Sequence, residues 1–450
     1  MKKFFLVTGC WLLVAGLSAQ TVTLQLQKAF QKFENDSQLK HAISSLYVID
    51  AKTGEVVFDK NSQIGLAPAS TQKIITAATA FELLGKEFRY STDFFYVSKN
   101  VFVLGKGDPT FGSWRYKNTI DTVIFNNVIN AANKKGWLSV SRFFLIENER
   151  IKNIPSRWIY EDIGNYYGAA PFNLNWHENQ FDVTFIPGDK AGDATSIDTI
   201  ATKWWRHLIN NCKTGKAGSG DNAYIYPVPN SKYSVIEGTI PAGVKRFTIS
   251  ASDHDPDISF GFAFKDHVYK EESEDLDAVP FNSDKLNGKE LLYTHYSPTL
   301  DSIVYWFLKK SINLYGESLI ATLAGNDMGI GQADSGINIV KKFWKDKGID
   351  EDELNIYDGS GLSPMNRVTT HAQVEILKYA KSKDWFKYFY DGLPEFNGMK
   401  MKSGTIGDVK GFCGYHKSKD GKEYIFSFLV NNYSGSGISN KMYKVLDELK

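Results

Sequence analysis

Residues 67–85 read APASTQKIITAATAFELLG and combine a Ser-x-x-Lys pair with the start of an apolar, helical pattern. Ser70 and Lys73 are three positions apart, so they share one helix face and the lysine lies within reach of the serine hydroxyl. The free N–H groups of a helix start also favour negative charge on the serine oxygen. A neutral Lys73 could therefore accept the proton of a Ser70 nucleophile. The alternative is that Ser70 only caps the helix and Lys73 is solvated.

Two further short motifs each occur more than once, and their context separates the candidates. Ser311-Ile312-Asn313 lies between two predicted helices, whereas Ser98-Lys99-Asn100 lies in a polar turn. Lys402-Ser403-Gly404-Thr405 leads into the terminal strands. The two literal Lys-Thr-Gly sequences, at 52–54 and 213–215, are instead expected in a hairpin turn and a polar loop. The order Ser70, Ser311, Lys402 then matches the active-site set of penicillin-binding proteins and serine β-lactamases.

The two ends of the chain have matching patterns. Residues 24–36 predict a helix and residues 44–59 a strand, a turn and a strand. Residues 409–416 and 423–433 predict two more strands, and residues 439–450 a last helix. We therefore expect an α+β fold in which both ends share one antiparallel sheet flanked by helices.

The middle of the chain has a different texture. From residue 89 to 285 short aromatic-rich segments are broken by Gly, Pro, Asn and Asp, which predicts a large, mostly β insertion of two subdomains. The catalytic domain would then comprise residues 20–88 and 286–450.

The first residues indicate the compartment. Lys2 and Lys3 precede an apolar run over 4–17 that ends in Leu17-Ser18-Ala19. This pattern predicts a signal peptide over 1–19, and hence secretion across an inner membrane into the periplasm. The mature chain keeps only two cysteines, Cys212 and Cys413, which excludes a disulfide framework and leaves a single bridge open.

Composition excludes several other classes. With 52 basic and 51 acidic residues the formal net charge is +1, so nothing indicates a nucleic-acid partner. The eight His residues are scattered without the spacing of metal ligands, and we expect no metal and no cofactor. Oligomeric state is open at this point.

Five stretches together carry a resemblance to one family. The chain resembles the D-alanyl-D-alanine carboxypeptidase/endopeptidases of the DacB type, the penicillin-binding protein 4 family. The resemblance implies a β-lactamase/transpeptidase-like domain with a large insertion between the nucleophile helix and the Ser-x-Asn motif. The stretches are GKGDPTFGSWRY (105–116), WIYEDIGNYYGA (158–169), SINLYGESL (311–319), DGSGLS (358–363) and KSGTIGDVKGFCGY (402–415).

The family implies a role for each catalytic residue. Ser70 would form an acyl-enzyme with a peptidoglycan stem peptide, and Lys73 would accept its proton. Ser311 would relay a proton to the leaving amine, while Asn313 would hold the acyl-side amide and Lys73. β-Lactam antibiotics would acylate Ser70 and act as inhibitors.

The resemblance also implies a substrate-binding set on the Lys-Ser-Gly-Thr segment. Lys402 and Ser403 would bind the terminal carboxylate, and Gly404 belongs to the same set. The backbone N–H groups of Ser70 and Thr405 would form the oxyanion hole.

Two more positions match the family in the Trp-x-x-x-Asp segment. Asp162 and Tyr167 would recognise the free end of a diaminopimelate side chain; the alternative is a structural Asp in a turn and a core Tyr. Some relatives place Arg directly after Asp-Gly-Ser-Gly-Leu-Ser, where this chain has Pro364, with Arg367 three positions later. This departure leaves side-chain recognition open.

Two other functions compete with a DD-peptidase. A serine β-lactamase shares the nucleophile chemistry, and a non-catalytic peptidoglycan-binding protein shares the fold. The sequence leaves open whether the enzyme trims terminal D-alanine or cuts cross-links.

Overall fold

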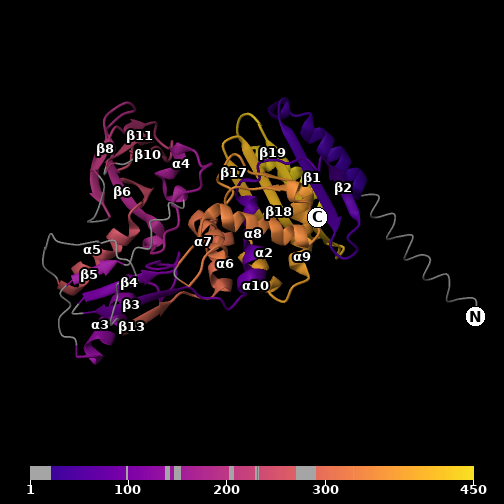
Figure 1. Cartoon of the computed structure of the whole chain (residues 1–450). Helices are drawn as coiled ribbons and strands as arrows, with labels where there is room; N and C mark the ends of the chain where they lie inside the picture. The colour runs from indigo at the N-terminus through magenta and orange to yellow at the C-terminus, as the bar shows by residue number, and fades with distance from the viewer. Residues whose placement is uncertain are drawn as a thin grey trace, which may run out of the picture. The chain divides into compact units, whose positions relative to one another are not determined.

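The computed structural model describes residues 22–97, 100–136, 142–145, 154–201, 207–228, 231, 233–269, 290–327 and 329–450 (Figure 1). The predicted signal peptide lies outside these residues. The chain forms two compact units, of which the first comprises Met1–Glu82, Val304–Ser311 and Val340–Lys450. The second comprises Leu83–Ile303 and Ile312–Ile339.

A six-stranded sheet forms the centre of the first unit, in the order β16-β17-β18-β19-β1-β2. Neighbouring strands are antiparallel throughout, and β1 pairs with β19 from Ile43 opposite Asn431 to Asp50 opposite Tyr424. The prediction that the two ends of the chain share one sheet is therefore confirmed. The strands are β1 (Ile43–Asp50), β2 (Val56–Lys60), β16 (Glu395–Phe396), β17 (Met399–Ile406), β18 (Val409–Lys417) and β19 (Glu423–Asn431).

Helices cover both faces of this sheet (Figure 1). A helix over 22–34 and α11 (Ile438–Leu446) pack on one face, where Phe412 and Phe428 join their apolar side chains in one core. Residues of the opposite parity face α9 (Thr370–Lys381): the Tyr415 hydroxyl donates to Leu377 O at 2.8 Å. The sheet is thus buried on both faces, which explains why its central strands are apolar at consecutive positions.

Five further helices and a small sheet include the segments around the sequence motifs. They are α2 (Lys73–Leu84), α6 (Leu300–Lys310), α7 (Asn313–Leu323), α8 (Ala333–Asp346) and α10 (Phe386–Gly392), with β14 (Leu354–Asn355) and β15 (Arg367–Val368) forming a two-stranded sheet. Within the described residues, no helix combines the length and apolarity needed to cross a membrane.

The second unit contains two separate hydrophobic cores. The first lies where α3 (Asp121–Lys134) and α5 (Pro256–Tyr269) cover a four-stranded sheet. That sheet has the order β13-β3-β4-β5, from β3 (Ser91–Val97), β4 (Asn100–Gly105), β5 (Arg142–Leu145) and β13 (Glu290–Tyr296). Because β13 pairs with β3, this compact unit continues beyond the predicted insertion boundary at residue 285.

The second core of this unit lies among seven short strands. Lys213-Thr214-Gly215 forms strand β9, so the prediction of a polar loop there is wrong: the segment pairs with β11 and buries Thr214. The strands are β6 (Gln180–Ile186), β7 (Ser196–Ile200), β8 (His207–Asn210), β9 (Lys213–Gly215), β10 (Asn222–Pro227), β11 (Tyr233–Pro241) and β12 (Phe247–Ser252).

A buried ion pair fixes one turn of the second unit. The Glu178 carboxylate is 2% exposed and accepts from Arg115 Nε at 2.8 Å, Ser113 Oγ at 2.7 Å and Tyr315 Oη at 2.8 Å. Residues 177–179 all adopt positive φ, between 49° and 55°. Such a run of non-glycine residues is unfavourable by itself, so the contacts of Glu178 must compensate for it. Tyr315 belongs to α7, so the pair also fixes the start of that helix.

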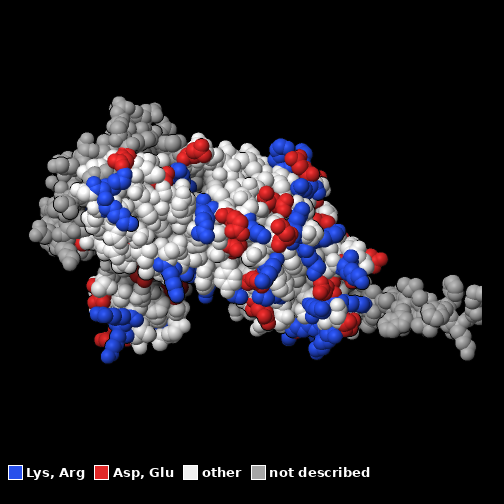
Figure 2. Space-filling model, turned by 90° about the horizontal axis from the view of Figure 1, so that it is seen from below, with Lys and Arg blue, Asp and Glu red and all other residues white. Residues whose placement is uncertain are grey.

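Basic and acidic side chains are interspersed on the face of the molecule in Figure 2, as expected for a chain whose formal charges nearly cancel.

We predict that Arg115→Met lowers the free energy of unfolding by about 3 kcal/mol, because it leaves the Glu178 charge buried without its cation. Urea unfolding followed by tryptophan fluorescence measures the change. The matched control is Lys342→Met, which removes an exposed ion pair with Asp346 and should cost no more than about 0.5 kcal/mol. A loss below about 1 kcal/mol for Arg115→Met would mean that the hydroxyl donors alone satisfy Glu178.

Candidate active site

Ser70 lies in a single 3-10 turn, η2 (Ala69–Gln72), and Lys73 is the first residue of α2 directly after it. Ala69 adopts φ +46°, a left-handed conformation that is uncommon for a residue with a Cβ atom. The turn lies in contact with β17 and β18.

Lys73 is fully buried, with 0% of its surface exposed. Its Nζ lies 2.9 Å from Ser70 Oγ and 2.7 Å from Ser360 O. On the side of α6, Nζ lies 5.9 Å from the centre of the Phe307 ring. The alternative in which Lys73 is a solvated surface lysine is therefore wrong. A buried amine within hydrogen-bond distance of a partly exposed hydroxyl has the geometry that proton transfer requires.

The loop 358–363 also contacts Lys73, through Ser360 O. Its place in the site was not predicted from the sequence. The Asp358 carboxylate accepts the backbone N–H groups of Gly361 at 2.8 Å and Ser363 at 2.6 Å, which closes the loop. Ser360 O is thereby presented to Lys73. A Cβ on Gly361, at φ +82°, would lie 2.0 Å from Ala69 O, so only glycine fits. The available signal was an acidic residue directly before a Gly-Ser-Gly sequence.

A chain of buried hydrogen bonds holds the turn that contains Ser70. Gln373 of α9 donates to Thr71 Oγ1 at 2.9 Å and accepts from Ser427 of β19 at 2.6 Å. Thr71 Oγ1 in turn donates to Pro68 O at 2.6 Å. Both Thr71 and Gln373 are fully buried, so these bonds tie the turn to a helix and to the sheet.

Strand β17 places the Lys-Ser-Gly-Thr segment beside Ser70. A Cβ at position 404 would lie 2.8 Å from Ser70 N and 2.7 Å from Pro68 O, so the glycine permits the contact between strand and turn. Lys402 is 1% exposed, and its Nζ donates to Ser403 O at 2.8 Å. Burial lowers the pKa of Lys402 to about 7, opposed by Cys413 and assisted by the charge of Lys410.

Ser311 and Asn313 occupy the turn between α6 and α7, as predicted. Ser311 is the last residue of the Val304–Ser311 segment of the first unit and adopts φ +59°. It follows Phe307 by one helical turn. Asn313, the first residue of α7, belongs to the second unit and donates from Nδ2 to Tyr167 O at 2.7 Å. The second unit therefore brings Asn313 and Tyr167 together, and the first unit brings Ser70, Lys73 and Gly404 together.

Asp162 belongs to the short helix α4 (Tyr160–Ile163), and Tyr167 to the turn η3 (Tyr166–Gly168). Burial raises the pKa of Asp162 to about 6; Glu161 adds to the rise and a hydrogen bond to Tyr167 opposes it. Asp162 is thus a half-buried carboxyl group that is hydrogen-bonded to Tyr167. The backbone carbonyl of the same Tyr167 accepts the hydrogen bond from Asn313.

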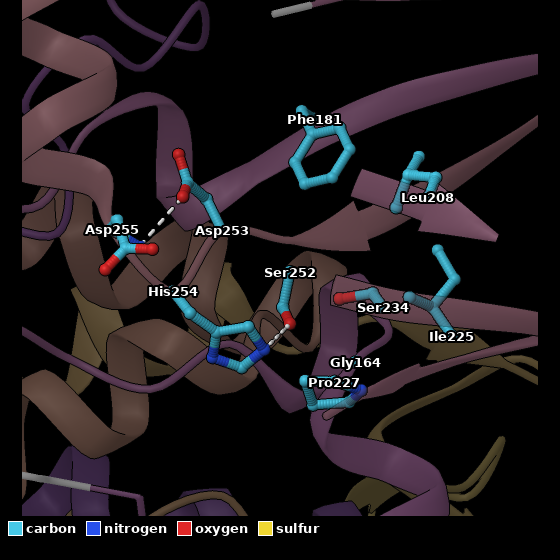
Figure 3. Close-up of a pocket in the computed structure, with 10 residues that line it drawn as sticks. All are labelled: Gly164, Phe181, Leu208, Ile225, Pro227, Ser234, Ser252, Asp253, His254 and Asp255. Atoms are coloured by element: carbon cyan, nitrogen blue, oxygen red, sulfur yellow. Dashed lines mark hydrogen bonds between the residues drawn. The ribbon is translucent and has the colours of Figure 1, made fainter. Parts of the chain in front are cut away.

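Figure 3 shows the cavity behind this segment. Ser252 Oγ donates to Ile163 O at 2.6 Å and lies 2.9 Å from His254 Nε2, which holds the turn after Asp162. The cavity has a volume of about 20 Å³, room for roughly one water molecule, so it is not a substrate pocket.

Other sequence features also have clear outcomes. Lys52-Thr53-Gly54 forms the β1–β2 hairpin turn as predicted, with Asp50 Oδ1 accepting both Lys52 N and Thr53 N. Ser98 and Lys99 lie outside the described residues. Cys212 and Cys413 are both buried free thiols. Within the part of the chain that the structure describes, no group of three or more His, Cys, Asp or Glu side chains could hold a metal ion.

The fold and this site define a class. An antiparallel sheet between helical layers, a Ser-x-x-Lys turn with a buried lysine, and a Lys-Ser-Gly-Thr strand against that turn are the features of penicillin-recognising serine enzymes. A family model described as "D-Ala-D-Ala carboxypeptidase 3 (S13) family" matches residues 26–395, and the chain belongs to this family. It is a serine-type D-Ala-D-Ala carboxypeptidase. The matched residues include Ser70, Lys73, Ser311 and Asn313 and end before Lys402.

Relatives extend the similarity to nearly the whole chain. A D-alanyl-D-alanine carboxypeptidase of Actinomadura sp. (strain R39) is 26% identical over 91% of this chain and 82% of its own length. The D-alanyl-D-alanine carboxypeptidase DacB of Haemophilus influenzae is 21% identical over 98% and 96%. The crystal structure of penicillin-binding protein 4 (dacB) from Haemophilus influenzae superposes with a TM-score of 0.73 at 18% identity, covering 91% of this chain and 95% of that one. The fold predicted from sequence is thus confirmed.

We predict that Gly404→Ala lowers kcat/KM for D-alanine release by about 100-fold, because the added Cβ must displace the Ser70 backbone and small misplacements of reacting groups are costly. D-Alanine released from a D-Ala-D-Ala peptide measures this. Gly407→Ala, in the turn after the same strand, has no atom within 4 Å of its Cβ; its φ of +44° makes alanine unfavourable there, which lowers the free energy of unfolding, but kcat/KM of the folded enzyme should stay within about 2-fold. Equal activity of the two variants would contradict the close approach of strand and turn.

Proposed function

We propose that Ser70 is the nucleophile and Lys73 the general base of a DD-peptidase acting on peptidoglycan stem peptides. The observation that carries the proposal is the 2.9 Å contact between Lys73 Nζ and Ser70 Oγ at a fully buried lysine. In this reaction Ser70 Oγ attacks the carbonyl carbon between two D-alanines and its proton passes to Lys73. The C–N bond breaks, D-alanine leaves, and water then hydrolyses the ester on Ser70.

The turn after α6 would complete the proton path. Ser311 would relay the proton from Lys73 to the leaving amine, and Asn313 would hold the amide on the acyl side. The Asn313 amide already donates to Tyr167 O, which restricts its rotation and supports a positioning role.

Strand β17 would bind the other end of the substrate. Lys402 and Ser403 would bind the terminal carboxylate, and Gly404 would let the strand lie against the nucleophile. The backbone N–H groups of Ser70 and Thr405 would stabilise the oxyanion, where loss of one donor typically costs about 2.7–4 kcal/mol.

Asp162 and Tyr167 would recognise the free amine at the end of a diaminopimelate side chain. An approaching ammonium favours the charged form of a carboxyl group, so it would counter the burial that raises the pKa of Asp162 to about 6. The cationic end of the substrate would in this way compensate for a partly desolvated carboxylate.

Inhibition, location and domain organisation follow from the same proposal. β-Lactams would acylate Ser70, and one of the superposed Haemophilus structures is described as complexed with a novel β-lactam. Residues 1–19 would direct the enzyme to the periplasm as a signal peptide. Residues 20–88 and 286–450 would supply the catalytic domain and 89–285 the insertion, in two subdomains.

We predict that benzylpenicillin adds its own mass to the protein, on the peptide that contains Ser70, and that Ser70→Ala abolishes the adduct. Lys73→Met should slow adduct formation by about 100- to 10,000-fold, because a general base is lost. Intact-mass measurement followed by peptide mapping tests both.

The chain offers a matched control in its second Ser-x-x-Lys pair. Ser37 begins a 3-10 turn, η1 (Ser37–Leu39), and Lys40 directly follows it; Ser37→Ala should label like the unmodified enzyme. An adduct that survives Ser70→Ala would disprove the nucleophile. Rapid turnover of penicillin in place of a lasting adduct would favour the β-lactamase alternative.

We predict that kcat/KM for a peptide ending in D-Ala-D-Ala falls as the pH rises above about 7. The pKa of Lys402 is lowered to about 7, so its ammonium is present below that pH and is lost above it, together with its attraction for the carboxylate. Lys402→Arg keeps its charge and should move the alkaline decline to higher pH. A decline that stays at the same pH in this variant would assign it to another group.

A further inference from the structure

Lys410 lies directly opposite Thr405 in the β17–β18 pair. Its Nζ donates to Thr405 Oγ1 at 2.7 Å and lies 5.0 Å from the centre of the Phe412 ring. Because side chains alternate along a strand, Lys410 and Thr405 lie on the face opposite to Lys402. Two lysines therefore flank β17, one on each face of the sheet.

The strand between these lysines has an open edge. β16 pairs only with Met399 and Lys400, so among the described strands none pairs with residues 402–406 on the side away from β18. Ser403 and Thr405 thus lie on an edge that a ligand can approach, and Gly404 brings the same edge to Ser70.

Lys410 has no acidic partner among the residues that the structure describes: no carboxylate oxygen lies within 4 Å of its Nζ, unlike Lys441, which pairs with Asp36. Lys410 is also half-buried, and this burial lowers its pKa. A partly desolvated ammonium without a counter-ion gains from a bound anion.

The hydrogen bond to Thr405 has a direction that matters for a ligand. A lysine ammonium can only donate, so Thr405 Oγ1 is the acceptor, and its own hydroxyl proton remains available to a second acceptor. A donor that is itself hydrogen-bonded to a cation is polarised and binds anions more strongly. Lys410 thereby makes Thr405 a donor for an anionic group at the open edge.

We propose that Lys410 is a specificity-determining residue that strengthens recognition of the substrate's terminal carboxylate through the Thr405 hydroxyl. This inference rests on the proposed function, in which that carboxylate binds along β17. Lys402 would attract the carboxylate from one face of the sheet, while Lys410 acts from the other face through Thr405.

The test compares two substrates that differ only in charge at the end: a peptide ending in D-Ala-D-Ala with a free carboxylate, and the same peptide with a terminal carboxamide. Lys410→Met keeps the length of the side chain and removes its charge. It should lower kcat/KM for the carboxylate about 10-fold, mostly through KM, and leave the carboxamide within about 2-fold. Lys410→Arg should restore most of the preference.

Two further variants make the test specific. Lys400→Met removes a lysine of β17 that lies opposite Tyr415, away from Thr405, and should leave the ratio between the substrates unchanged. In a Thr405→Ala background, Lys410→Met should cause no further loss on the carboxylate, because the two residues act in series. Equal losses on both substrates, or additive losses in the double variant, would overturn the proposal.

Failure here is distinct from failure of the proposed function. If Ser70 were not the nucleophile, the penicillin adduct would be absent from its peptide, whatever the substrate ratio of Lys410→Met. If the adduct forms on Ser70 and the ratio does not change, only the role of Lys410 is disproved.

Discussion

The burial of Lys73 is the constraint on which the first unit depends. An amine with 0% exposure must find partners inside the protein, and its partners include the Ser70 hydroxyl and the Ser360 carbonyl. These partners come from distant parts of the chain, because Ser70 belongs to the turn before α2 and Ser360 to a loop 287 positions after Lys73. The Lys73 side chain therefore links the position of the Ser70 hydroxyl to the packing of the loop that contains Ser360.

Close backbone approach is the second requirement, and glycine meets it at two points around the same turn. Gly361 lies close to Ala69 O and Gly404 lies close to Ser70 N, so the loop and the strand both pack against the turn that carries the proposed nucleophile. The polar chain from Thr71 through Gln373 to Ser427 fixes the same turn from behind. The turn is thus held by groups that are not themselves reactive.

Local spacing predicted some of these features and could not predict others. Two of the predicted features depend only on neighbouring residues. They are the i to i+3 relation of Ser70 and Lys73, and the hairpin turn at residues 52–54, which excludes Lys52-Thr53-Gly54 as the active-site motif. The sheet shared by both ends followed from matching strand patterns. The role of Asp358 and Ser360 depends instead on a contact between distant segments, which no periodicity encodes.

The contact of Lys410 with Thr405 required the register of β17 on β18, since a shift of one residue would place them on opposite faces. Segment 213–215 was misjudged because pairing with β11 outweighed its polar, glycine-rich composition.

Among the described residues of the first unit, those with positive φ that are neither glycine nor asparagine are Ala69 and Ser311, and both lie in the proposed site. Ala69 and Ser311 both adopt positive φ, at 46° and 59°, although neither is glycine. One residue directly precedes the proposed nucleophile, and the other is the proposed proton relay itself. A residue in the left-handed conformation turns the chain sharply within one position. Ser70 can therefore lie at the start of the helix and also close to β17. Such strain persists only where surrounding contacts determine the conformation. At Ala69 those contacts are visible, since the residue is fully buried and its carbonyl lies against Gly361. The rigidity of this turn and the reactivity assigned to Ser70 therefore have a common origin, because a serine that rotated away from Lys73 would remove one hydrogen-bond partner from a buried amine.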